Sequence, residues 1–188
     1  MAATGQFPKR RKNQKTRGSK AENTEKSLFD TMFSSDFFNL FALLIICVVG
    51  IANGPVGMVF FYEKEVQDKA IELGLTTREM INKRRMTAFI ALLVPQLLVV
   101  PLMVYIVNGA PDFKTAAVQM TVIYLISGLF DRLFIDWYWV GKTKAWIIPG
   151  TEDMMPYIYG KTLVGKWVST LIGFPILAVL IAWVVSKL

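Results

Sequence analysis

The sequence predicts an all-α integral membrane protein with four apolar helical segments arranged as two hairpins. Hydrophobic residues make up 54% of the 188 residues, and they gather in four blocks: residues 37–62, 86–109, 115–140 and 163–185. Each block meets the requirement of about 20 largely apolar residues for a helix that spans a bilayer. Because four spans use most of the chain, we expect one transmembrane domain over residues 36–188 and no second folded domain.

The N-terminal residues 1–35 differ from the rest in composition. Residues 1–26 carry eight Lys and Arg side chains, with Gly, Ser, Thr and Asn between them. Such a segment cannot bury a core, so we expect residues 1–35 to be a disordered basic tail. Anionic lipid head groups are its expected partner, since each basic residue near such a surface contributes about 1 kcal/mol. No aromatic residues are interleaved with the charges, which argues against nucleic-acid binding.

The first apolar block is interrupted at Asn53-Gly54-Pro55. Proline removes one helical hydrogen bond and disfavours helix at the residue before it. A broken backbone inside a membrane needs neighbouring groups or water to satisfy it. Two interpretations follow: a spanning helix that is kinked, or a re-entrant or broken helix in which Asn53 belongs to a ligand site.

The polar segment 63–85 is expected to form a short surface helix followed by the start of a second helix. Gly74 is a natural helix stop. Thr76 and Glu79 match the two members of a capping box, which predicts that the second helix begins there.

The third block carries three charged residues before it ends, Asp131, Arg132 and Asp136. Charge inside a bilayer is costly and usually marks a function or a specific partner. Arg132 and Asp136 are four residues apart, so they can pair on one helix face. Asp131 points elsewhere and needs a partner of its own, Tyr124 or a residue of another helix.

Further polar and small residues share the helix face of Asp131 at spacings of three and four, and these are Thr121, Tyr124, Ser127, Gly128 and Tyr138. This face is the expected bundle interior. The candidate ligand or ion pathway therefore consists of Asp131, Arg132, Asp136, Tyr124, Ser127 and, from the first block, Asn53. The alternative role for the three charges is a buried polar clamp that fixes how the helices pack.

A second acidic group follows the third block. Pro149-Gly150 fits the middle of a type II turn, after which Thr151 can cap a short helix beginning with Glu152 and Asp153. If Glu152 and Asp153 met Asp136, their oxygens could hold a hard divalent cation. The spacing does not show that they meet, so no metal site is firm.

The sequence contains no histidine and a single cysteine, Cys47. This excludes histidine general bases and the usual zinc sites. No cofactor is required by the sequence.

Basic residues are unevenly divided between the loops. Six Lys and Arg follow the first block and four follow the third, whereas the loop after the second block has one. The positive-inside rule therefore places loops 63–85 and 141–162 in the cytoplasm. With four complete spans the basic tail would lie on the opposite side. Either the tail is translocated, or the first block does not cross, or the basic loops are outside.

The segment D-W-Y-W-V-G-K-T-K-A-W-I-I-P-G-T-E-D, residues 136–153, resembles a segment of an uncharacterised family of small bacterial four-helix membrane proteins. The resemblance covers the second hairpin and implies a four-span bundle in a bacterial cytoplasmic membrane. It implies no activity.

Three functional hypotheses follow. The leading one is a non-enzymatic protein, a small transport component or an accessory subunit that packs against other membrane subunits. The second is a lipid-acting enzyme that uses the acidic residues and a divalent cation. The third is a purely structural or assembly protein.

Overall fold

The computed structural model describes residues 40–188 except 42, 46 and 53. The basic tail over residues 1–35 and the candidate residue Asn53 lie outside this part. All regular elements between residues 40 and 188, the three gaps aside, are helices, and no strand occurs there. The all-α class is therefore confirmed.

In the part of the chain that the structure describes, three helices are long and apolar enough to cross a membrane: Arg78–Val107, Phe113–Val140 and Gly160–Val185. They correspond to the second, third and fourth apolar blocks. The first block gives the shorter apolar helix Leu43–Ala52 and then the 3-10 helix η1, Pro55–Phe61. Gly54 between them has φ 89°, a backbone conformation that glycine adopts without strain.

Each long helix contains a π-helical stretch. Helix α3 (Arg78–Leu102) continues as η2 (Met103–Val107), α4 (Phe113–Phe130) continues as η3 (Asp131–Val140), and α5 (Gly160–Val168) leads through η6 (Ser169–Gly173) into α6 (Phe174–Val185). In a π-helix each hydrogen bond spans five residues instead of four. The residues that share a face therefore change where such a stretch begins.

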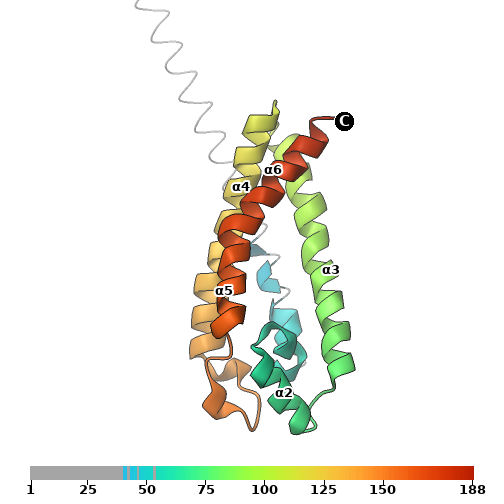
Figure 1. Cartoon of the computed structure of the whole chain (residues 1–188). Coiled ribbons are helices and arrows are strands. Elements are labelled where there is room, and N and C mark those ends of the chain that lie inside the picture. Colours follow the sequence, from blue (N-terminus) through green and yellow to red (C-terminus); the bar gives the residue numbers. More distant parts are fainter. Residues whose placement is uncertain (1–39, 42, 46, 53) are drawn as a thin grey trace, which may run out of the picture.

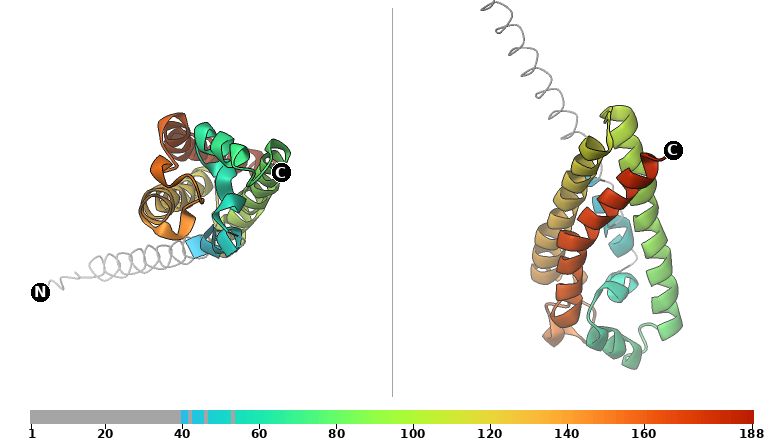
Figure 2. Two further views of the ribbon diagram at one scale, coloured as in Figure 1. Left: turned by 90° about the horizontal axis from the view of Figure 1, so that it is seen from below. Right: turned by 45° about the horizontal axis from the view of Figure 1, so that its top comes forward.

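The three long helices are close together at one end and spread at the other (Figures 1 and 2). Helix α4 packs tightly against η6 and the start of α6 because Gly128 leaves room. A Cβ atom at Gly128 would lie 2.6 Å from Cγ2 of Thr170 in η6 and 3.0 Å from Cε2 of Phe174 in α6. Helix α6 then crosses to the far end of α3, where Tyr105 Oη donates to the carbonyl oxygen of Ala182 at 3.4 Å. Helix α2 (Lys64–Glu72) and η1 fill the spread end.

Among the described residues, the packing forms two separate hydrophobic cores. One lies among α4, α6 and the end of α3, with buried side chains that include Val104, Met120 and Tyr124. The other lies at the spread end, where buried Val66, Trp146 and other residues of η1, α2 and the 141–162 loop pack together.

The start of α3 differs from the sequence prediction by one residue. The N-cap is Thr77, whose Oγ1 accepts a hydrogen bond from the backbone N–H of Met80 at 3.2 Å. The predicted capping box of Thr76 and Glu79 is therefore wrong, because Thr77 is the last extended residue (φ −123°, ψ 159°). The predicted stop at Gly74 is confirmed, with φ 70° just after α2.

The two basic loops meet at the spread end of the bundle. Glu63 donates its backbone N–H to the carbonyl oxygen of Tyr157 at 3.0 Å, and its carboxylate accepts from the N–H of Thr162 at 3.0 Å. Loops 63–85 and 141–162 therefore lie on the same end, as the hairpin arrangement predicts. The turn between α3 and α4 and the C-terminus lie at the opposite end (Figure 1).

Within the 141–162 loop, the type II turn at Pro149-Gly150 is confirmed. Thr151 donates its N–H to the carbonyl oxygen of Ile148 at 3.1 Å, and Gly150 has φ 83°. The predicted cap is wrong, because the Thr151 hydroxyl instead donates to the Ile148 carbonyl at 2.9 Å. The side chain of Thr151 is completely buried next to the Tyr157 hydroxyl, 2.8 Å away, so it is not available to the following turn.

Candidate functional site

Four side chains of alternating charge form a continuous chain between η3 and α5. The Arg132 guanidinium contacts the Asp131 carboxylate, and its Nη1 lies 2.5 Å from Oδ2 of Asp136. Lys166 Nζ donates to Oδ1 of Asp136 at 2.8 Å. The side chains of Asp131, Arg132, Asp136 and Lys166 are 24%, 8%, 7% and 19% exposed. We call these four residues the charge chain.

The predicted pair Arg132–Asp136 is confirmed, but the partner of Asp131 is not the expected one. The sequence indicated Tyr124 or another helix, whereas the structure gives the adjacent Arg132. The long, flexible arginine stem reaches sideways, so one guanidinium meets both carboxylates. The Tyr124 hydroxyl donates instead to the backbone carbonyl of Gln96 on α3, at 2.5 Å.

The sequence does not identify Lys166 as a site residue, because this lysine is one of the four basic residues that follow the third apolar block. The available signal was its position inside the fourth apolar block. It lies on α5, where its ammonium is also 5.3 Å from the ring centroid of Phe61. Lys166 supplies the second positive charge, and the chain is neutral as a whole. Mutual pairing is what makes burial of such charges tolerable.

The charge chain lies near one edge of the hydrocarbon layer rather than at its middle. Asp131 follows Phe113 by 18 residues of α4, which is about 27 Å at 1.5 Å per residue. A bilayer core is about 30 Å thick. The site is therefore at the end of the bundle that carries the two basic loops, and Asp136 lies still closer to the surface.

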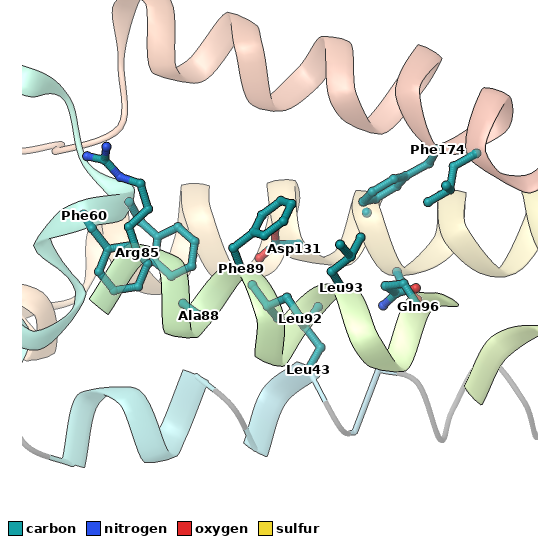
Figure 3. A pocket seen from close by; sticks show the side chains of 14 residues that line it. Leu43, Phe60, Arg85, Ala88, Phe89, Leu92, Leu93, Gln96, Asp131 and Phe174 are labelled. Atoms are coloured by element: carbon teal, nitrogen blue, oxygen red, sulfur yellow. The ribbon is translucent and has the colours of Figure 1, made fainter. Parts of the chain in front are cut away.

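Two cavities of about 320 Å³ and about 330 Å³ adjoin the charge chain. Each is about twice the size of an engineered apolar cavity of about 150 Å³ that holds benzene. The first is lined mainly by apolar side chains, several of them from α3 and α6, and Asp131 of η3 is also part of its wall (Figure 3). The second is lined by all four members of the charge chain. Both cavities share the wall residues Leu43, Phe61, Leu92, Asp131 and Phe174.

The second cavity is also bordered by donors that lack an acceptor. Tyr62 Oη, Trp146 Nε1 and Arg132 Nε are buried and have no hydrogen-bond partner among the described residues. An unsatisfied buried polar group costs about 1–3 kcal/mol. A polar occupant near these groups would offset that cost.

The other residues that the sequence placed on the interior face differ in burial and in whether they line a cavity. Ser127 is buried and lines the first cavity, whereas the buried Tyr124 lines neither cavity. Tyr138, expected on the same interior face, is 51% exposed. The π-helical stretch from Asp131 changes the angular step between residues, which rotates Tyr138 away from the bundle.

The acidic residues do not assemble into one group. Asp136 is buried, while Glu152 and Asp153 are exposed. Backbone N–H groups of Glu152 and Gly150 lower the pKa of the Glu152 carboxyl below its ordinary value. In the part of the chain that the structure describes, no group of three or more Asp, Glu or Cys side chains could hold a metal ion.

The fold and this site define a polytopic α-helical membrane protein with buried, paired charges. Comparison with known protein families, curated proteins and solved structures gives no match for the chain. The geometry of the site is therefore the basis for its proposed function.

Proposed function

We propose that this chain is a small transport component of a bacterial cytoplasmic membrane, acting alone or as an accessory subunit of a larger membrane complex. One observation carries the proposal: Asp131 lines both cavities and begins a row of four ionisable side chains. Ionisable residues within membrane helices are rare, and they often mark routes for ions or protons.

The exposure of the charge chain supports a pathway that starts at Asp131. Its side chain is the most accessible of the four, at 24%. It is also the only one of the four that lines the first cavity. A proton or cation arriving there would meet a carboxylate first and Arg132 and Asp136 next.

The two alternatives are less well supported. A structural clamp would explain why every charge is paired, but it does not require a carboxylate open to two cavities. The lipid-acting enzyme requires a carboxylate site for a divalent cation. The exposed Glu152 and Asp153 do not join Asp136 in such a site among the described residues.

The proposed orientation keeps loops 63–85 and 141–162 in the cytoplasm, because their positive charges favour that side. The first apolar block then completes a four-segment bundle that is kinked or broken at Gly54. The basic tail over residues 1–35 is proposed to bind anionic lipid head groups.

The test is ion flux in liposomes that contain the purified protein. A pH gradient and a membrane potential are imposed, and internal pH and Na⁺ are followed with fluorescent indicators. Asp131→Asn keeps the shape of the side chain but removes its charge, so flux should be lost while thermal stability in detergent stays near that of the wild type. Asp68→Asn, an exposed carboxylate in the α2 region, is the matched control and should retain flux.

Wild-type liposomes without flux above protein-free liposomes would contradict independent transport. The accessory role then predicts co-migration with other subunits in complexes extracted from native membranes, and loss of co-migration in Asp131→Asn. An Asp131→Leu protein that is stable and fully functional in both assays would contradict the whole proposal.

A further inference from the structure

The first cavity is a groove that follows one face of α3. The α3 residues that line it are Arg85, Ala88, Phe89, Leu92, Leu93 and Gln96. Their spacings of three and four residues place them on a single helix face (Figure 3). Gln96 lies 11 positions after Arg85, a rise of about 16 Å along the helix, which is about half of a 30 Å hydrocarbon core. The groove therefore has the depth of one leaflet.

The position of the charges fixes which end of the groove is at the membrane surface. Arg85 is the last charged residue before residues 86–107, which contain none. Those 22 residues are about 33 Å long as a helix, enough to cross the hydrocarbon core. The mouth of the groove at Arg85 is thus at the surface, and its inner end near Gln96 and Phe174 is near the middle of the bilayer.

The mouth of the groove carries positive charge that no carboxylate of the described residues pairs with. Arg85 follows Lys83 and Arg84 directly. Within the described part of the chain, the acceptors of the Arg84 and Arg85 side chains are neutral oxygens, the Val56 carbonyl at 3.3 Å and the Gln67 amide at 3.1 Å. Across the described residues, no carboxylate lies within ion-pair distance of these three side chains.

The interior of the groove has no such excess. Its single acidic group, Asp131, is paired with Arg132. Most of the remaining wall is apolar, with Phe60, Phe61, Phe174 and Leu177 opposite α3. An occupant must therefore combine an anionic head at Arg85 with an apolar body about half a bilayer long.

We propose that the groove binds one acyl chain of an anionic phospholipid, with the lipid phosphate held at Arg85. Basic pockets between transmembrane helices are suited to anionic lipid head groups. The alternative occupant is a helix of a partner protein, which the Leu92→Trp variant below distinguishes from a lipid. This lipid site goes beyond the transport function proposed above and does not depend on it.

The experiment measures lipid binding to the purified full-length chain in detergent by native mass spectrometry. The probes are dioleoylphosphatidylglycerol, which is anionic, and dioleoylphosphatidylcholine, which has the same acyl chains and no net charge. The variant Arg85→Gln removes the charge at the mouth. Lys83→Gln is the matched control, since Lys83 belongs to the same basic run but does not line the groove. Leu92→Trp fills the groove itself.

The wild type should bind one phosphatidylglycerol more tightly than phosphatidylcholine. Arg85→Gln should weaken phosphatidylglycerol binding about tenfold, equivalent to about 1.4 kcal/mol, and leave phosphatidylcholine binding unchanged. Lys83→Gln should have a clearly smaller effect. Leu92→Trp should weaken the binding of both lipids, because both need room for the chain.

Equal losses in Arg85→Gln and Lys83→Gln would overturn the site and leave only general attraction to a basic surface. Unchanged lipid binding in Leu92→Trp would also overturn it. If Leu92→Trp does not fold, the smaller change Ala88→Leu takes its place with the same expectations. A dimer that Leu92→Trp converts to monomer, without a change in lipid affinity, would assign the groove to a second copy of the chain.

Discussion

Neutralising Asp136 should be among the most destabilising single changes in the charge chain, because this carboxylate has two cationic partners. Oδ1 accepts from Lys166 Nζ at 2.8 Å, and Oδ2 lies 2.5 Å from Nη1 of Arg132. The variant Asp136→Asn keeps the size of the side chain. It leaves the ammonium of Lys166 without a counter-charge and leaves Arg132 with Asp131 alone.

The expected magnitude follows from the burial of these groups. Arg132 and Asp136 are 8% and 7% exposed, so water can compensate little of the lost pairing. Breaking a buried ion pair by removing one partner costs about 3–5 kcal/mol. Replacing Lys166 as well removes the orphaned cation. The double variant Asp136→Asn/Lys166→Met should therefore recover about 1–3 kcal/mol of that loss, a coupling typical of residues in contact.

The assay is reversible denaturation of the purified protein in detergent, followed by tryptophan fluorescence and checked by size-exclusion chromatography. The exposed ion pair of Asp68 and Arg78, with side chains 50% and 45% exposed, provides the control. Asp68→Asn should cost no more than about 1 kcal/mol, as is usual for surface pairs. If Asp136→Asn is no more destabilising than Asp68→Asn, or the double variant is no better than the single one, the buried charge chain does not stabilise the bundle as argued.

Three further predictions concern a helix cap, a helix contact and the topology. Asp112 caps α4, and the hydrogen bond from the backbone N–H of Thr115 to its carboxylate, 2.9 Å long, lowers its pKa below the ordinary 3.8. Because the pKa is lower in the folded state, the ionised carboxylate contributes stability above pH 3.8, and this contribution is lost as the pH falls through the lowered value. Asp112→Ala should therefore reduce the melting temperature at pH 7 but make little difference near pH 2.5, and an equal effect at both pH values would contradict the cap. Gly128→Ala should destabilise the protein by about 1–3 kcal/mol, since its new methyl group would overlap Thr170 of η6. A variant as stable as the wild type in chemical denaturation would show that α4 and η6 are not closely packed there. Cysteines placed at Asp68 and Glu152, in a background without the native cysteine, should react with a membrane-impermeant thiol reagent from the same side of the membrane, and one at Asp112 from the other; opposite labelling at the first two would end the two-hairpin arrangement.

The sequence alone established the class of fold, because the signal for a membrane helix is local. Residues 86–107 and 163–185 are largely apolar over enough consecutive positions to cross a bilayer whatever surrounds them. The stop at Gly74 and the turn at Pro149-Gly150 are also local, since they depend on backbone preferences of the residues themselves. The same holds for the pairing of Arg132 with Asp136, which needs only one turn of helix.

Other local predictions failed where a neighbouring group competed. Thr76 and Thr77 are both able to cap a helix, and the backbone geometry selected Thr77. Thr151 has the right chemistry for a cap, but Tyr157 and the Ile148 carbonyl lie closer in the folded loop. One-residue differences of this kind are decided by packing that the sequence pattern does not contain.

Only the tertiary structure decided the composition of the site. Lys166 is 30 positions from Asp136 along the chain and reaches it because α5 runs beside η3. The π-helical stretch that begins at Asp131 determines which side chains of η3 face inward, and no residue pattern in the sequence predicts this stretch. Likewise, Glu152 and Asp153 are near Asp136 in sequence but stay at the surface, since the turn at Pro149-Gly150 directs them outward. Whether a segment forms a membrane helix depends on its own consecutive residues. Which side chains meet between helices depends on how all the helices pack together.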